Sequence, residues 1–436
     1  MKKVVIFSWL GLLAMLIIGA AGCERETRVA DPVRFATLVT PDGSGSYPTI
    51  QEAVDAASDG DVIELADGLF SGPGNRDIDF LGKAITIRSR SGKPSLCVID
   101  CQGTPEDPHR GFIFRNQEDR DSVLEGIGIT NGYVANIDEE FGLGGGVLCL
   151  YTSRPTLRNL AIVGNRATGG GGLGCFARSS PLVTDCLFED NHATVAGGAV
   201  MISEESSPEL KRVLFRGNSA TERGGAVFAS AKSQPVFSDC RFEENLAEFG
   251  GAVAGTGFTL EDCRLVDNHA YDDGGAVAAA GSTVINNCIM SGNRAETAGG
   301  GVHFQGRNHV TNCTLAGNRA GRNGSGLSLA RNANVTIDRT IVVFGKNRKG
   351  VFVHPEARVV ISCSNIFGNE GGDWAEGIDG LEGLDGNMCA DPLFCPATVH
   401  GPGYCSLRGD SPCLATACGP MGAVGVGCCP DVTHVP

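Results

Sequence analysis

The stretch FEENLAEFGGAV, at residues 242–253, decides the fold because its order of residue types returns along the chain. The same order occurs as FEDNHATVAGGAV at 188–200, FRGNSATERGGAV at 215–227 and LVDNHAYDDGGAV at 265–277. A motif that recurs with a period of roughly 20–50 residues is typical of repeat proteins, in which each unit packs mainly on its neighbours. The motif is therefore expected to be a unit of construction before it is a site.

Aligning the repeats on their asparagine gives several registered columns. The asparagines are spaced by 26, 27, 27, 23, 25 and 25 residues, with an apolar residue three positions before each and an alanine two positions after. Alternation with period 2 on both sides predicts short strands with one buried face. Units of about 25 residues with two or three such strands predict the coils of a parallel β-solenoid. We expect a structural ladder of amide side chains at one turn of the coils, formed by Asn165, Asn191, Asn218, Asn245, Asn268, Asn293 and Asn318.

These repeats resemble those of a known family. The GGAV and FxxN pairs are similar to the repeats of chlamydial polymorphic outer membrane proteins, over roughly residues 125–330. The resemblance implies an all-β fold, a single right-handed parallel β-helix of the pectin-lyase-like superfamily. That family ends in a translocating β-barrel, whereas this chain ends in a Cys-rich segment, so autotransport is not implied.

The segment PDGSGSYPTIQEAVDAA, at residues 41–57, differs from the repeat. Ile50, Val54 and Ala57 fall on one face of a predicted amphipathic helix. The segment resembles the start of pectin methylesterases, in which such a helix caps one end of the β-helix. The catalytic stretches of that family are missing, since GFIFR begins with Gly111 where the family needs Asp. Esterase chemistry is therefore not expected.

The N-terminus reads as an export signal. Two lysines precede an apolar run over residues 4–21, and AAGC at 20–23 resembles a bacterial lipobox, although Ala stands where Leu is usual. We expect residues 1–22 to be a signal peptide, Cys23 to carry the lipid, and residues 23–34 to be a tether. The alternative is an uncleaved transmembrane anchor.

The C-terminal segment, residues 365–436, is rich in cysteine and is expected to form a stapled cap. In an exported protein the first expectation is a disulfide framework, with a zinc site as the rival interpretation. The disulfide candidates are Cys363, Cys389, Cys395, Cys405, Cys413, Cys418, Cys428 and Cys429. A second set recurs five residues before the asparagines and is expected to stay as buried thiols: Cys240, Cys263, Cys288 and Cys313.

No residue of the chain is expected to be catalytic. On the outward face of the strands that follow the glycines, only His303 could carry proton chemistry, and it stands without a carboxylate in its column. That face is expected to be small and apolar. Acidic residues near the turns could hold calcium, or could simply form a solvated edge: Glu189, Asp190, Glu243, Glu244, Asp267, Asp272 and Asp273. We expect no other cofactor.

The function predicted from these features is that of a bacterial cell-envelope lipoprotein at the outer membrane or cell surface. Its formal net charge of −15 argues against nucleic acid as a partner. We expect a monomer, held to the membrane by its lipid, whose β-helix binds a polysaccharide or a surface protein. The alternative is a polysaccharide lyase or glycoside hydrolase with its site in loops near residues 100–120 or 135–144. Residues 35–124 would hold the N-terminal cap and first coils, and 125–364 the regular repeats.

Overall fold

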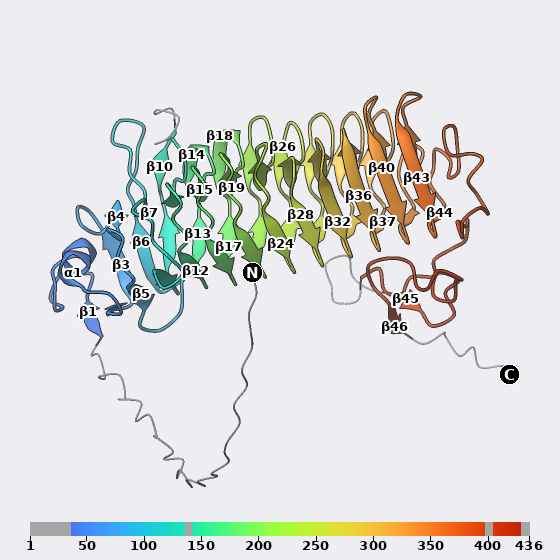
Figure 1. The fold of residues 1–436 in the computed structure, drawn as a ribbon. Coiled ribbons are helices and arrows are strands. Elements are labelled where there is room, and N and C mark those ends of the chain that lie inside the picture. The colour runs from blue at the N-terminus through green and yellow to red at the C-terminus, as the bar shows by residue number, and fades with distance from the viewer. Residues whose placement is uncertain (1–35, 136–141, 397–403, 429–436) are drawn as a thin grey trace, which may run out of the picture. The chain divides into compact units, whose positions relative to one another are not determined.

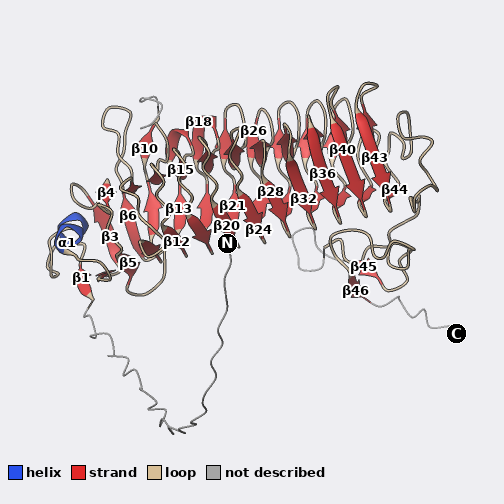
Figure 2. Cartoon of the chain, in the orientation of Figure 1, coloured by secondary structure: helices blue, strands red, loops and turns tan. Residues whose placement is uncertain are grey.

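The computed structural model describes residues 36–135, 142–396 and 404–428. The chain winds into one parallel β-helix with four sheets (Figures 1 and 2), which we call A, B, C and D. Each complete coil adds one strand to sheet A, then to B, D and C, and every strand pairs in parallel with its counterpart in the next coil. The parallel β-solenoid predicted from the repeat is confirmed, but each complete coil holds four short strands and not two or three.

The strands are short and follow one another regularly. Sheet A contains β1 (Thr37–Val39), β2 (Val62–Leu65), β5 (Thr86–Ser89), β8 (Val123–Glu125), β12 (Thr156–Arg158), β16 (Leu182–Thr184), β20 (Glu209–Lys211), β24 (Val236–Ser238), β28 (Thr259–Glu261), β32 (Thr283–Asn286), β36 (Arg307–Thr311), β40 (Asn334–Asp338) and β43 (Arg358–Ser362). Sheet B contains β3 (Gly68–Ser71), β6 (Cys97–Asp100), β9 (Gly128–Thr130), β13 (Ala161–Val163), β17 (Leu187–Glu189), β21 (Leu214–Arg216), β25 (Arg241–Glu243), β29 (Arg264–Val266), β33 (Ile289–Ser291), β37 (Thr314–Ala316), β41 (Ile341–Val343) and β44 (Asn365–Phe367).

The other two sheets complete each coil. Sheet D contains β10 (Tyr133–Val134), β14 (Arg166–Gly169), β18 (His192–Ala196), β22 (Ser219–Ala220), β26 (Leu246–Ala247), β30 (His269–Ala270), β34 (Arg294–Ala295) and β38 (Arg319–Ala320). Sheet C contains β4 (Ile78–Asp79), β7 (Phe112–Phe114), β11 (Val147–Cys149), β15 (Leu173–Cys175), β19 (Val200–Ile202), β23 (Val227–Ala229), β27 (Val253–Gly255), β31 (Val277–Ala279), β35 (Val302–Phe304), β39 (Leu327–Leu329) and β42 (Val351–Val353). A separate pair is formed by β45 (Leu407–Arg408) and β46 (Val426–Cys428).

Identical repeat positions lie in register from coil to coil. Phe242 pairs with Phe215 on one side and with Leu265 on the other, and all three side chains are fully buried. The rings of Phe188, Phe215 and Phe242 stack in one column, with centroids 5.3 and 4.7 Å apart. The period-2 pattern therefore identifies the inner and outer faces of sheet B correctly.

The asparagines form a buried column at the end of the sheet B strands. Asn245 Nδ2 donates to the carbonyl of Phe215 at 3.0 Å and to Asn268 Oδ1 at 2.9 Å, while its Oδ1 accepts from both nitrogens of Asn218 at 3.0 Å. The same pattern runs through the seven positions from Asn165 to Asn318. Each amide thus satisfies backbone groups that the turn would otherwise leave unpaired inside the protein.

The two glycines of the repeat have a steric cause. Gly250 adopts φ +64°, a backbone conformation that other residues adopt only at a cost. A Cβ atom on Gly251 would lie 2.3 Å from the carbonyl oxygen of Gly275 in the next coil. The pair of glycines therefore permits both the turn into sheet C and the close approach of successive coils.

The interior cysteines are free thiols with a structural role. Cys240, Cys263, Cys288 and Cys313 are buried and unbridged, and Cys313 Sγ accepts from the backbone nitrogen of Cys288 at 3.5 Å. In the next coil Thr340 takes the equivalent place, where its Oγ1 accepts from the nitrogen of Cys313 at 3.3 Å. The column is a second ladder at the turn from sheet A to sheet B.

The N-terminal end of the helix is covered as predicted. Helix α1 (Ile50–Ala56) begins at Thr49, whose side chain accepts from the nitrogen of Glu52. Ile50, Ala53 and Val54 are buried and join the main core. Among the described residues, no helix is long and apolar enough to cross a bilayer.

The C-terminal segment covers the end of the β-helix and also part of the outer face of sheet B. Trp374 and Ile378 join the main core at that end, but residues 404–428 pack on the outer face of sheet B. There Ile289, Ile341 and Val343 form an apolar cluster with a set from the C-terminal segment: Cys405, Leu407, Cys413 and Met421. In the two coils before Ile289 the equivalent outward position holds Arg241 and Arg264, so the change to apolar residues helps to explain where this segment binds.

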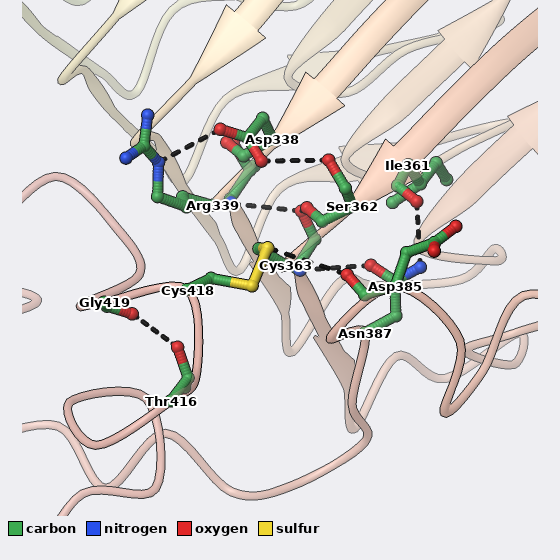
Figure 3. The surroundings of a disulfide bond; sticks show 12 residues. Asp338, Arg339, Ile361, Ser362, Cys363, Asp385, Asn387, Thr416, Cys418 and Gly419 are labelled. Carbon is green, nitrogen blue, oxygen red and sulfur yellow. Dashed lines mark hydrogen bonds and ion pairs between the residues drawn. A yellow bond between two sulfur atoms is a disulfide. The ribbon is translucent and has the colours of Figure 1, made fainter.

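Two disulfides fix this segment. Cys363 pairs with Cys418, which ties the segment to the turn after β43 (Figure 3), and Cys395 pairs with Cys428. Cys405 and Cys413 are free and buried, and Cys389 is free and exposed. Cys429 and Cys23 lie outside the described residues. Burial in the apolar cluster, which the spacing of cysteines does not reveal, explains why two of the candidates stay unpaired.

We expect reducing agent to release the C-terminal segment first. Loss of a native disulfide typically costs about 2–5 kcal/mol of stability. One disulfide ties this segment to the β-helix, and the other closes a loop within the segment. The repeats at 145–330 hold no disulfide in the structure. Limited proteolysis with mass spectrometry should therefore show cleavage within 404–428 before cleavage within 145–330. Equal sensitivity of both regions would argue against this arrangement.

Candidate functional site

A notch lies on the outer face of sheet C, over strands β23, β27, β31 and β35. The central outward residues of these strands are Phe228, Ala254, Ala278 and His303, which pair successively in register. Neighbouring strands are about 4.8 Å apart, so Phe228 and His303 belong to strands roughly 14 Å apart. Two small side chains between two large ones leave a hollow about the width of two coils. We call this hollow the notch.

The notch is lined on both sides by longer side chains. Its volume is about 480 Å³, within the range of roughly 300–1,000 Å³ that is usual for ligand pockets. Turn residues that precede the glycines supply one wall: Arg223, Phe249 and Asp273. The residues that follow the strands supply the other wall: Ser230, Thr256, Ala280 and Gln305. Apolar surface and hydrogen-bonding groups therefore face the same space.

The notch begins where the rest of the face is covered. On the preceding strands of sheet C, Leu148 and Leu150 are buried in a cluster with Leu143, and Phe176 and Met201 pack against it. Phe228 is the next outward side chain along the sheet and is only half-buried. The accessible part of this face therefore starts at the notch.

His303 and Asp273 face each other at the notch. Their Nε2 and Oδ2 atoms are 3.8 Å apart, and the side chains are 12% and 21% exposed. The Asp273 carboxylate also accepts from the nitrogen of Ala298 at 2.9 Å. His303 has no carboxylate in its own column, as expected, but Asp273 reaches it from the turn of the preceding coil, which the column does not reveal. The floor of the notch is small and apolar, as expected, and the polar groups come from the turns beside it.

Burial controls the protonation of this pair. Burial lowers the pKa of His303 from its ordinary value of 6.5, although Asp273 opposes the shift. Burial also raises the pKa of Asp273, although His303 opposes that shift. A histidine with a lowered pKa is neutral at pH 7, and a neutral imidazole can accept a proton.

The acidic residues near the turns, which the sequence analysis considers for calcium, do not lie together in one site. Glu189 accepts from Arg216 Nε at 2.8 Å, and Glu243 lies 2.7 Å from Arg241 Nη2. Within residues 36–135, 142–396 and 404–428, no three His, Cys, Asp or Glu side chains are grouped so that they could hold a metal ion.

The loops near residues 100–120, which the sequence analysis considers for an enzyme site, contain a second cluster of charged side chains. His109 Nδ1 contacts Asp77 Oδ2, and its Nε2 lies 3.0 Å from Asp107 Oδ2. Arg76 lies 3.7 Å from the same Asp107 carboxylate. These contacts join two loops of the first coils. The adjacent hollow has a volume of about 320 Å³ and is lined by Gln51, Pro73, Gly74, Arg76, Asp77 and His109. Residues 136–141 of the other proposed loop lie outside the described residues.

Comparisons with known proteins agree with this architecture. Residues 125–289 and 196–315 match the family described as "Right handed beta helix region". These matches lie within the regular coils of the parallel β-helix that the structure describes. A search of curated proteins found no match.

Solved structures that are similar in fold include polysaccharide lyases and a hydrolase. A PL6 family polysaccharide lyase from Pseudopedobacter saltans is 11% identical, with a TM-score of 0.48 over 81% of this chain and 92% of its own. A PL6 family alginate lyase is 14% identical, with a TM-score of 0.46 over 85% of this chain and 55% of its own. The catalytic domain of a GH87 α-1,3-glucanase is 12% identical, with a TM-score of 0.44 over 74% of this chain and 67% of its own.

Proposed function

We propose that the protein binds a glycan chain on the outer face of sheet C, with one sugar residue seated in the notch. The observation that carries this proposal is the lining of the notch. Sugar rings present apolar C–H faces and polar hydroxyl edges, so they need aromatic surface beside hydrogen-bonding groups. Phe228 and Phe249 supply the first, and Arg223, Thr256 and Gln305 supply the second.

The direction of the sheet favours a polymer as the ligand. Sheet C repeats the same strand position every coil, so its outer face continues past the notch along the helix axis. Beyond His303 the next outward residue is the small Ser328. A chain that leaves the notch in this direction passes His303 and the buried Ser328 before it reaches Phe352 on β42, whereas the cluster around Leu143 closes the opposite direction.

We expect Ala278→Trp to abolish glycan binding without unfolding the protein. The indole would fill the notch from its floor, and Ala278 faces outward and is only half-buried. Affinity for the oligosaccharides that bind the wild type, measured by calorimetry over a panel of neutral and uronate glycans, should fall by at least about tenfold, or about 1.4 kcal/mol.

The matched control is Ala161→Trp, which places the same ring on the outer face of sheet B. It should bind glycans like the wild type. Equal loss in both variants, or full binding by Ala278→Trp, would show that the glycan does not bind in the notch.

The proposal includes an envelope location, with Cys23 carrying a lipid. The support is the AAGC stretch at residues 20–23 after an apolar run. Cells grown with labelled palmitate should label the wild type and fail to label Cys23→Ser, because the substitution removes the thiol that is acylated. Label that persists in Cys23→Ser would refute lipidation at this residue.

A second candidate function is glycan cleavage, which the contact between His303 and Asp273 favours. A neutral imidazole beside a bound sugar could accept a proton from it, and general base catalysis typically contributes about 10²–10⁴-fold in rate. Wild-type protein should then release new reducing ends or unsaturated products from a bound glycan. His303→Gln should lose this activity by at least roughly 100-fold while it keeps its affinity. If the wild type binds a glycan and releases no product, the cleavage function is rejected and only the binding function stands.

A further inference from the structure

The loop between β6 and β7 holds an Asp–Pro peptide bond that is followed directly by a histidine. The three residues are Asp107, Pro108 and His109. His109 Nε2 lies 3.0 Å from Asp107 Oδ2, and within the described residues this nitrogen forms no hydrogen bond of good geometry. A carboxylate and an imidazole nitrogen therefore meet next to the bond that joins Asp107 to Pro108.

His109 is held in place by its backbone and by its other ring nitrogen. Its backbone nitrogen donates to the carbonyl of Tyr133 at 3.1 Å, and its carbonyl accepts from the nitrogen of Tyr133 at 2.8 Å. Its Nδ1 contacts Asp77 Oδ2, while Asp77 Oδ1 accepts from the nitrogen of Arg110 at 2.9 Å. A carboxylate on Nδ1 orients the ring, so that Nε2 faces Asp107.

The loop before Pro108 is closed by two hydrogen bonds with Thr104. The nitrogen of Thr104 donates to the main-chain carbonyl oxygen of Asp107 at 3.0 Å. The nitrogen of Asp107 donates to Thr104 Oγ1, also at 3.0 Å. The first of these bonds polarises the carbonyl group of the Asp107–Pro108 bond, and a donor in this place stabilises negative charge that develops on the oxygen.

We propose that the protein cleaves its own Asp107–Pro108 bond in mildly acidic solution. The side-chain carboxylate of Asp107 attacks the main-chain carbonyl carbon of the same residue and closes a five-membered cyclic anhydride. The bond from this carbon to the Pro108 nitrogen breaks, and the nitrogen leaves as a secondary amine with a proton from His109 Nε2. Water then opens the anhydride, so the balance is hydrolysis of one peptide bond, with two carboxyl groups on Asp107 and a new N-terminus at Pro108.

The arrangement supplies what this reaction needs. Attack within one residue replaces a bimolecular encounter, which raises a rate by several orders of magnitude. A histidine that acts as general acid typically contributes about 10²–10⁴-fold. Asp107 is 70% exposed, so water reaches the anhydride. Asp107 and Pro108 are thus the reacting residues, His109 is the proton donor, and Asp77 is a positioning residue.

The chain also contains its own comparison. A second Asp–Pro bond joins Asp391 to Pro392, but Leu393 stands where the first has a histidine. The Asp391 carboxylate accepts from the nitrogen of Leu393 at 2.9 Å. The two bonds share the same attacking group and the same leaving group, so a difference in their rates measures what the surroundings of Asp107 contribute.

The reaction requires an ionised Asp107 and a protonated His109 at the same time. Aspartate and histidine side chains in general meet both conditions between about pH 4 and pH 6.5. The charged groups that face the imidazole are the carboxylates of Asp77 and Asp107, and Arg76 lies 3.7 Å from the second of them. The rate is therefore expected to follow a bell-shaped pH profile.

The cut leaves the β-helix assembled. Strand β4 pairs with β7, β5 with β8, and β6 with β9, so strands on the two sides of the cut stay hydrogen-bonded to each other. The cleaved protein should remain one particle in native buffer and separate into two chains in denaturant. The notch lies entirely in the larger fragment, so this inference and glycan binding succeed or fail independently.

The test is incubation of the purified protein at pH 5 and at pH 8, followed by denaturing electrophoresis and mass spectrometry of the fragments. At pH 5 we expect fragments that end at Asp107 and begin at Pro108, formed at least about 100-fold faster than cleavage at Asp391–Pro392. At pH 8 the rate should fall by at least about tenfold, because the imidazole is then neutral. In water labelled with oxygen-18, part of the label should enter the side-chain carboxyl of Asp107, as the opening of an anhydride allows.

Four variants divide the roles. His109→Gln should slow the cut by at least about 100-fold, whereas the matched control His309→Gln, at an exposed position of β36, should cleave like the wild type. Asp77→Asn should move the alkaline limb of the pH profile to lower pH, because the imidazolium loses a neighbouring negative charge. Pro108→Ala keeps both side chains and should also slow the cut, which preserves the test if His109→Gln does not fold.

Several results would overturn the proposal. They are the absence of a cut at Asp107–Pro108 at pH 5, equal rates at the two Asp–Pro bonds, and an unchanged rate in a folded His109→Gln. Oxygen-18 confined to the main-chain carboxyl of Asp107 would exclude the anhydride. Cleavage at full rate in urea would also contradict the proposal, because unfolding separates His109 from Asp77 and Tyr133.

Discussion

Asn245→Leu should lower the free energy of unfolding by roughly 3 kcal/mol or more. The substitution removes the partner of three buried groups, namely the carbonyl of Phe215 and both nitrogens of Asn218. Each buried polar group that loses its partner costs about 1–3 kcal/mol, and leucine cannot replace any of these bonds. Because each coil rests mainly on its neighbours, the damage should be strongest within one or two coils.

Hydrogen exchange and urea unfolding of the purified variant would measure this loss. The matched control is Asn334→Leu, the same substitution at an exposed position of β40, which should cost less than about 0.5 kcal/mol. Similar costs for the two variants would mean that the ladder is not a principal support of the helix.

Phe215→Ala should have a comparable effect for a different reason. Its ring is fully buried between Phe188 and Phe242, with centroid distances of 5.3 and 4.7 Å. Replacement of a buried Phe by Ala typically costs about 3–5 kcal/mol, through lost burial and the cavity that remains. Urea unfolding should show the loss.

The control for this variant is Tyr271→Ala, whose side chain is 60% exposed. Removing an exposed ring should change the free energy of unfolding by less than about 0.5 kcal/mol. If Phe215→Ala were as mild as Tyr271→Ala, the assignment of the inner column of sheet B would be wrong.

Much of the fold can be predicted because each coil repeats the same physical requirements. Phe242 must face inward, Asn245 must satisfy the turn, and Gly251 must allow close approach of the next coil. These requirements recur at each coil, so the columns are visible in one sequence. The gap in the ladder is visible too, since Gly345 stands where Asn is expected and Asn369 in the following coil donates to Val342 and accepts from Gly345.

The notch could not be predicted in the same way. It results from two small side chains, Ala254 and Ala278, between larger ones. It also depends on the contact between Asp273 and His303, which lie 30 positions apart in the sequence. The alignment of repeats shows only which equivalent positions stack on one another. A contact between a turn residue and a strand residue of the next coil joins two different positions, so the alignment does not show it. The binding of residues 404–428 to sheet B had a readable signal, namely Ile289, Ile341 and Val343 at outward positions.

The most direct test of the central claim is a crystal structure of the protein with the oligosaccharide of the panel that binds most tightly. We expect a sugar ring against Phe228, above Ala254 and Ala278, with hydrogen bonds from residues such as Arg223 or Gln305. A sugar bound elsewhere with the notch empty, for instance beside His109, would contradict it, as would the failure of every glycan to bind.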